Sequence, residues 1–140
     1  MIFSPELAEL VISGRKTVTR RPVKWDLVEP PLGIVPTGPH NRIAEEGKAK
    51  DCRYRVGRFY AVQPGRGKKA VGHIWIESVE MQALSAAFHH AEARAEGFTS
   101  SAGFKKHWLK LYGAFDPDQP VWRIAFHLIH PDDEPLWEGS

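Results

Sequence analysis

The run AVGHIWIESVEM at residues 70–81 constrains the fold more than any other part of the chain. Its side chains divide into two alternating sets, and large apolar groups occur in both. A strand with one face in water carries them in one set only, because successive side chains point to opposite faces of a sheet. The pattern therefore predicts a strand in the middle of a sheet.

Three further segments have strand character and can pair with this one. RFYAVQ at 58–63 precedes it, and a basic turn at 64–69 joins the two as a hairpin. This turn, PGRGKK, lacks the order of a phosphate-binding loop. VWRIAFHLI at 121–129 alternates cleanly, and the β-branched stretch 17–21 reads as a short strand that ends at Pro22.

Helical periodicity predicts three helices. The first begins with Ser4 as its cap and Pro5 at its first position, and Gly14 stops it. Two more are expected at 84–98, ending at Gly97, and at 99–113, capped near Ser100 or Ser101 and with Gly113 past its end. The last carries an apolar stripe that we expect to be core, formed by Phe104, Trp108 and Leu111.

This order of elements predicts an α+β domain around a small, curved or barrel-like sheet. The chain has 140 residues, and we expect a single domain at 1–130. Proline and glycine punctuate a long excursion at about 25–55, which is typical of a lid, a binding element or a disordered segment. The acidic tail at 131–140 has little to bury and is expected to be disordered.

Several classes of protein are disfavoured by the sequence. Cys52 is the only cysteine, so an internal disulfide or a cysteine-based zinc site is excluded. The seven histidines show no HxxxH spacing, and we expect neither a metal nor a cofactor. No signal pattern occurs, and no apolar run approaches about 18 residues. We therefore expect a cytoplasmic protein with no membrane partner.

The segment GRKTVTRR at 14–21 carries the most informative motif. It resembles the GxKxxTxR signature of the ASCH family, which has a PUA-like fold: a small curved β-barrel flanked by helices. Later segments match in the same order, namely VGRFYAV, VGHIWIESVEM, AEGF, FKKHWLKLYG and VWRIAFHL. The resemblance covers most of residues 2–129.

ASCH proteins are associated with RNA or modified nucleosides, and small bacterial members remove the acetyl group from N(4)-acetylcytidine with a Lys, a Thr and a Glu. The resemblance implies that Lys16, Thr19 and Glu96 are the corresponding catalytic residues here. The candidate substrate-binding residues are Phe3, Arg20, Arg21 and Tyr60. The expected substrate is an N(4)-acylated cytosine nucleoside, although the excursion is longer than the linker of the small members.

The chemistry of an amidohydrolase can be assigned to these residues in more than one way. Thr19 offers a nucleophilic hydroxyl, and Lys16 can activate it if its pKa is lowered by burial and by neighbouring arginines. Glu96 can position Lys16, assist the leaving nitrogen or orient water. A close carboxylate favours the charged form of lysine, which opposes the role of a base, so the identity of the base stays open at this point.

RNA binding, with or without ribonuclease activity, is the alternative function. Although the net charge is only +2, basic residues concentrate in two segments at 15–24 and 48–69. Aromatic residues lie among them: Trp25, Tyr54, Phe59 and Tyr60. Single-stranded RNA is held by such a combination of charge and stacking, and the candidate contacts are Arg66, Lys68 and Lys69. Two solvated loops would explain the same charges. A domain that only docks a partner, through the acidic tail and Trp137, is a further alternative.

Overall fold

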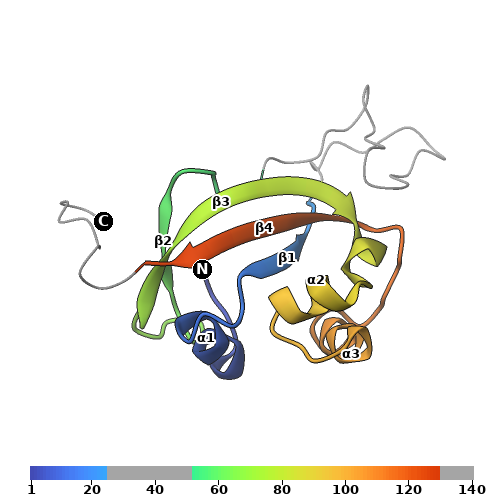
Figure 1. Ribbon diagram of the computed structural model, residues 1–140, viewed down its shortest axis with the longest axis horizontal. Helices are drawn as coiled ribbons and strands as arrows, with labels where there is room; N and C mark the ends of the chain where they lie inside the picture. The colour runs from blue at the N-terminus through green and yellow to red at the C-terminus, as the bar shows by residue number, and fades with distance from the viewer. Residues whose placement is uncertain (25–51, 130–140) are drawn as a thin grey trace.

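A computed structural model describes residues 1–24 and 52–129 of the chain. Most of the predicted excursion and the whole acidic tail lie outside the described residues, and so does Trp25. The described residues contain one four-stranded antiparallel sheet, in the order β1-β4-β3-β2 (Figure 1). Its strands are β1 (Val18–Pro22), β2 (Phe59–Val62), β3 (Gly72–Ala83) and β4 (Pro120–Leu128).

The strand predicted to be central does lie in the middle of the sheet. β3 pairs with β2 on one side and with β4 on the other, where the register runs from Ile74↔Leu128 to Ala83↔Pro120. A shift in this register between Ile76 and Ser78 marks a bulge. Bulges bend a strand and increase its twist, which agrees with the curved path of β3 in Figure 1.

The first three residues bridge the two edge strands of this curved sheet. Ile2 forms a parallel bridge with Gln63, next to β2, and the Phe3 amide donates to the Gln63 carbonyl at 2.9 Å. From the opposite edge, Nη2 of Arg21 on β1 donates to the Ile2 carbonyl at 2.8 Å. The predicted barrel-like sheet thus takes the form of an open sheet with a short N-terminal segment across its gap.

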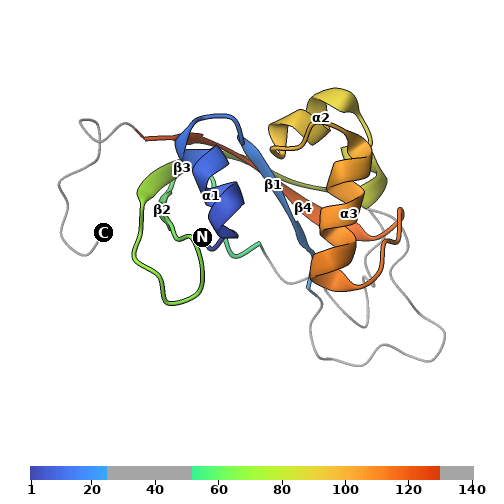
Figure 2. The ribbon, with the colours of Figure 1, turned by 90° about the horizontal axis from the view of Figure 1, so that it is seen from below.

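Three α-helices lie on one side of the sheet. These are α1 (Pro5–Ile12), α2 (His90–Ala95) and α3 (Ser101–Tyr112). Seen from below, α1 stands apart from the α2–α3 pair, and β1 passes between them (Figure 2). Ser4 caps α1 and Ser100 caps α3, and both Gly14 and Gly113 have positive φ just beyond the helices, as the sequence predicted.

The predicted single helix at 84–98 is instead a 3₁₀ turn, η1 (Leu84–Ala87), followed by the short α2. The amides of Leu84 and Ser85 donate to carbonyls of the loop before β4, at residues 119 and 117, which anchors this first turn. His89 is extended, with φ −120° and ψ 141°, and so separates the two pieces. Tertiary hydrogen bonds have overridden the local helical pattern here.

Two hydrophobic clusters hold the helices to the sheet. The larger joins α1 and residues 1–3 to the strands, and includes Phe3, Val11 and Ile74. The smaller joins α3 and η1 to the end of the sheet through Leu84, Phe104, Trp108 and Val121. Leu111, which we expected in the core stripe, is 57% exposed. Among the described residues, no helix has the length and apolar character needed to cross a bilayer.

Candidate active site

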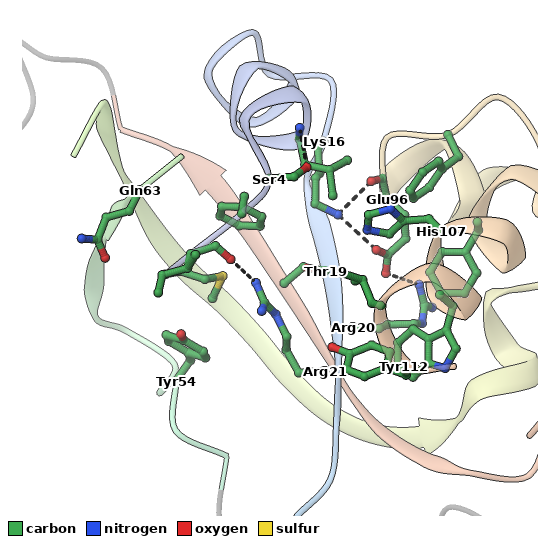
Figure 3. Close-up of a pocket in the computed structure, with 18 of the residues that line it drawn as sticks. Ser4, Lys16, Thr19, Arg20, Arg21, Tyr54, Gln63, Glu96, His107 and Tyr112 are labelled. Atoms are coloured by element: carbon green, nitrogen blue, oxygen red, sulfur yellow. Dashed lines mark hydrogen bonds and ion pairs between the residues drawn. The ribbon is translucent and has the colours of Figure 1, made fainter. Parts of the chain in front are cut away.

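A cavity of about 560 Å³ opens between α1 and α3, beside β1 (Figure 3). Its wall is built from residues 1–4, β1, the turn after α2 and one side of α3. Lys16, Thr19 and Glu96, the three predicted catalytic residues, all line this cavity, and so do Phe3, Arg20 and Arg21. A volume of this size is within the usual range for small-molecule sites.

Lys16 is almost completely buried, with 2% of its surface exposed. The turn at Gly14, where φ is +81°, ends α1 and directs the chain back so that the Lys16 amide bonds to the Leu10 carbonyl at 3.0 Å. Its Nζ then donates to three acceptors: the Val18 carbonyl at 2.7 Å, the Glu96 carbonyl at 2.8 Å and Glu96 Oε1 at 3.1 Å. These acceptors use all three N–H groups of an ammonium.

Two opposing influences act on the charge of Lys16. Burial is the larger and lowers the pKa of Lys16 below its usual value, with smaller contributions from Arg21 and Arg20. Glu96 acts in the other direction, through its charge and its hydrogen bond. The residue is therefore a buried lysine that can give up a proton more easily than a surface lysine can.

Glu96 reaches Lys16 because α2 ends at that point. Glu96 is the C-cap of α2, and Gly97 follows with φ +101°, a conformation that favours glycine. A Cβ added to Gly97 would lie 2.9 Å from Cδ1 of Leu10 on α1. The glycine thus permits the close approach between the α2–α3 turn and α1 that brings Glu96 to Lys16.

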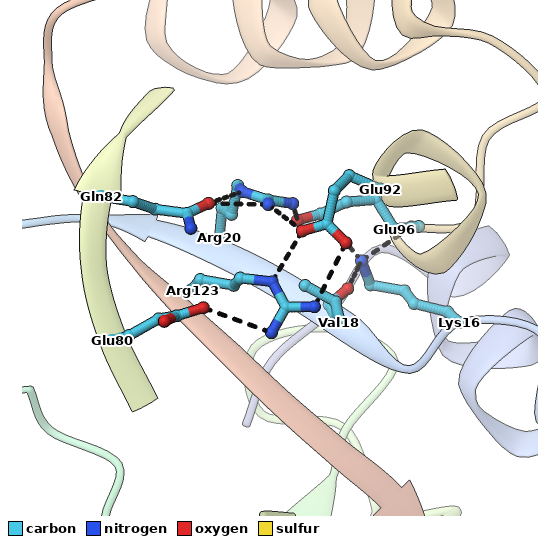
Figure 4. Close-up of polar contacts among 8 residues, drawn as sticks. All are labelled: Lys16, Val18, Arg20, Glu80, Gln82, Glu92, Glu96 and Arg123. Carbon is cyan, nitrogen blue, oxygen red and sulfur yellow. Dashed lines mark hydrogen bonds and ion pairs between the residues drawn. The ribbon is translucent and has the colours of Figure 1, made fainter. Parts of the chain in front are cut away.

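Arg20 holds the other side of the Glu96 carboxylate. Its Nη1 donates to Glu96 Oε2 at 2.9 Å, and its side chain is fully buried. Its remaining contacts are to Gln82 on β3 and to Glu92 on α2 (Figure 4). Arg20, predicted as a substrate-binding residue, lines the cavity, and protein acceptors engage its guanidinium there.

Thr19 lies on the same wall of the cavity and is 5% exposed. Within the described part of the chain, its hydroxyl makes no hydrogen bond, whereas Lys16 and Glu96 bond to each other. Thr17, the first residue of the predicted strand, precedes β1 and is exposed. Thr19 is therefore the threonine of this motif that meets the cavity.

Arg21 and Phe3 lie next to each other in the wall of the cavity. The guanidinium of Arg21 lies 5.5 Å from the centroid of the Phe3 ring, and Nζ of Lys16 lies 6.0 Å from the same ring. Phe3 is buried and also contacts Phe126 in the core. These two predicted substrate-binding residues lie where a bound molecule would touch them.

Tyr60 does not line this cavity; its neighbour Tyr54 does. The rings of these two tyrosines meet edge to face, with centroids 5.0 Å apart. Of the three candidate RNA contacts, Arg66 lines the cavity, whereas Lys68 and Lys69 are exposed on the turn between β2 and β3 and lie outside the lining. The alternating pattern correctly predicted that Tyr60 lies in a strand, β2. It did not indicate whether the side chain lines the cavity.

His107 on α3 was missed by the sequence reasoning and lines the cavity beside Glu96 (Figure 3). Burial, and then the positive charge of Lys16, lower the pKa of His107, which favours the neutral form of its ring. It follows Phe104 by three positions and precedes Trp108, which are both buried. The sequence did contain a signal for this residue, because a histidine next to the apolar stripe lies at the margin of the buried face of the helix.

No family model and no curated protein matches the chain. Solved structures do: an ASCH domain from Lactobacillus crispatus matches with TM-score 0.59 and 16% identity over 88% of this chain and 70% of that one. An ASCH protein from Zymomonas mobilis gives TM-score 0.51 and 15% identity, over 95% and 73%. A DUF984 protein from Enterococcus faecalis gives 0.53 and 22%, over 90% and 74%.

The fold is that of the ASCH domains. The expected α+β, PUA-like class is confirmed with it. At these sequence identities the likeness concerns the arrangement of the elements, so the activity of this ASCH-like chain has to be argued from its own side chains.

Proposed function

We propose that the chain is an amidohydrolase that removes the acyl group from N(4)-acylated cytosine nucleosides. One observation carries this proposal: Lys16, Thr19 and Glu96 line a single cavity, and Lys16 and Glu96 are in direct contact there. The ASCH-like fold is compatible with a hydrolase. The residue types are those that amide hydrolysis needs, a hydroxyl nucleophile, a group that exchanges protons and a carboxylate that orients it.

In the proposed reaction, Lys16 starts as the free amine, the form that burial favours. Oγ1 of Thr19 attacks the acyl carbon, and its proton passes to Nζ of Lys16. The bond from the acyl carbon to N(4) breaks, and Lys16 returns the proton to N(4), which leaves as the amino group of cytosine. Water then hydrolyses the acyl ester on Thr19 and releases the carboxylic acid.

This route gives Glu96 an orienting role. A free amine has two N–H donors and one lone pair, so Lys16 must give up one of its three present contacts before it can accept a proton. The Glu96 carbonyl and carboxylate can keep the other two N–H groups bonded, which directs the lone pair away from the α2–α3 turn. Arg20 in turn prevents the Glu96 carboxylate from rotating.

The test is the release of cytidine from N(4)-acetylcytidine and its longer acyl analogues, followed by chromatography. The wild type is expected to release cytidine, and Thr19→Ala and Lys16→Met are each expected to lower kcat/KM by about 10²- to 10⁴-fold. Lys16→Met keeps the length of the side chain in its buried site, and circular dichroism checks that both variants are folded.

Thr17→Ala is the matched control, because Thr17 is exposed and close to Thr19 in sequence but does not line the cavity. Its activity should equal that of the wild type. The proposal fails if the wild type releases no cytidine, or if folded Thr19→Ala is as active as the Thr17→Ala control.

RNA binding without amide hydrolysis is the second candidate, favoured by the exposed Arg66, Lys68 and Lys69 on one turn. It requires binding of unmodified single-stranded RNA that weakens steeply with salt. Charge reversal at Lys68 and Lys69 should then lower the affinity by at least tenfold, as measured by fluorescence anisotropy. Binding that ignores both salt and these substitutions would exclude it.

A further inference from the structure

The charges that line the cavity are strongly unbalanced. Among its described lining residues are six cationic side chains and one carboxylate, that of Glu96. Lys16 and Arg20 both pair with this carboxylate. Four cations are left over, which we call the cationic rim: Arg21, Lys24, Arg53 and Arg66.

No member of the cationic rim forms an ion pair with a carboxylate of residues 1–24 or 52–129. Lys24, Arg53 and Arg66 are exposed. Arg21 is half-buried, and its Nε is a buried donor with no hydrogen-bond partner. Buried donors are usually paired in folded proteins, so an unpaired guanidinium N–H beside a cavity calls for an acceptor that residues 1–24 and 52–129 do not supply.

A second cavity of about 430 Å³ continues from the first. The two share Arg21, Lys24 and Arg53 of the rim, together with Tyr54 and Tyr112. The second also has Trp122 in its wall. These three cations therefore lie at the boundary between two cavities that both have aromatic walls, and Arg66 lines the first cavity alone.

An acylated cytosine nucleoside is neutral and offers these four cations hydrogen-bond acceptors but no negative charge. Arginine guanidinium groups match the oxygens of a phosphate in geometry as well as in charge. A cleft lined by several cations also attracts anionic ligands over several ångströms. The rim thus has the composition of a phosphate site placed next to a nucleoside-sized cavity.

We propose that the substrate carries a phosphate ester, held by the cationic rim while the modified base occupies the first cavity. The inference rests on the proposed function for the identity of the base. The phosphate is either the terminal group of a mononucleotide or a bridging phosphate of a single strand. In the second case the next nucleoside occupies the second cavity, against Tyr112 and Trp122.

Isothermal titration calorimetry of the full chain tests this with three probes: cytidine, cytidine monophosphate and a short oligocytidylate. We expect the monophosphate to bind at least tenfold more tightly than cytidine at low salt, and the difference to shrink as salt increases. A further gain for the oligocytidylate indicates a bridging phosphate, and equal affinity indicates a terminal one; both support the proposal.

Arg53→Gln and Lys24→Gln are each expected to lower the affinity for the monophosphate by about threefold to tenfold and to leave that for cytidine unchanged. The matched control is Lys106→Gln, because Lys106 is exposed on α3 and lines neither cavity. Equal binding of cytidine and its monophosphate overturns the proposal, as does a loss in Lys106→Gln equal to that in Arg53→Gln. Oligocytidylate binding that depends on Lys68 and Lys69 but not on Arg53 also overturns it.

These measurements detect binding and not hydrolysis, so they separate the two proposals. If the protein hydrolyses N(4)-acetylcytidine but binds cytidine and its monophosphate equally, the proposed activity is supported and the proposed phosphate site is wrong. A chain that binds the monophosphate through the rim but hydrolyses nothing retains the phosphate site alone.

Discussion

Glu92 shows how a single carboxylate can organise this site from outside it. Its oxygens accept from Nε of Arg123 at 2.7 Å and from Nη2 of Arg123 at 3.2 Å, and Oε1 also accepts from Arg20. Arg20 in turn bonds to Glu96, the partner of Lys16. α2 is thus connected through Glu92 to both β1 and β4, and the orientation of Glu96 depends on this connection (Figure 4).

The acid sensitivity of the fold should depend on Glu92. Hydrogen bonds from Arg123, and then from Arg20, lower the pKa of Glu92 from 4.5 to about 2. A carboxylate with a lowered pKa in the folded state stabilises the protein above about pH 4.5, and this contribution is lost as the pH falls towards 2. Glu92→Gln should lower the free energy of unfolding at pH 7 by about 1–3 kcal/mol and flatten its decline in this window.

Urea unfolding measured at several pH values checks this prediction. Glu77→Gln is the control, because Glu77 and its partner His127 are both about half exposed, with side-chain exposures of 52% and 51%. Such a surface pair should change the stability by less than about 1 kcal/mol. Parallel pH profiles for Glu92→Gln and the wild type would contradict the role given to Glu92.

At the scale of elements, two glycines at helix ends are required for different structural reasons. Gly14 ends α1 with φ +81°, and a Cβ there would meet no atom within 4 Å. Gly97 ends α2 with φ +101°, and a Cβ there would lie 2.9 Å from Cδ1 of Leu10 and 3.6 Å from Cβ of Lys16. Both have a backbone conformation that favours glycine, but only Gly97 also lies at a close contact, the one between α1 and the α2–α3 turn beside the candidate site.

The pair of variants Gly14→Ala and Gly97→Ala measures this difference. Gly14→Ala should cost only the backbone strain, about 1–2 kcal/mol in the free energy of unfolding. Gly97→Ala should cost more, because the added methyl group also pushes α1 away from the α2–α3 turn. It should also reduce hydrolysis of N(4)-acetylcytidine, since Lys16 and Glu96 would separate. Equal losses of stability in the two variants would contradict this account.

At the scale of the whole molecule, a nearly neutral chain conceals a charged site. The net charge is only +2, yet cations greatly outnumber carboxylates around the main cavity. The fold divides these cations into two groups. Lys16 and Arg20 form ion pairs with Glu96, and Arg20 also pairs with Glu92. The cationic rim has no carboxylate partner in the described part of the chain.

The sequence by itself determined most of the elements and named several of the residues that line the main cavity. Strand alternation located the central strand, and Gly14, Gly97 and Gly113 were correctly expected at helix ends. The order of motifs led to the ASCH-like fold, which the solved structures confirm. These features depend on neighbours a few residues apart or on the order of segments, and a sequence displays both directly.

Only the tertiary structure decided which side chains meet. Lys16 and Glu96 are separated by 80 positions and meet because Gly97 lets two helical segments approach closely. Packing directs Arg20 to protein carboxylates. It leaves Nε of Arg21, the next residue on β1, without a hydrogen-bond partner among the described residues. Local patterns cannot predict such pairings, because the partner of a buried charge is supplied by whichever element packs against it.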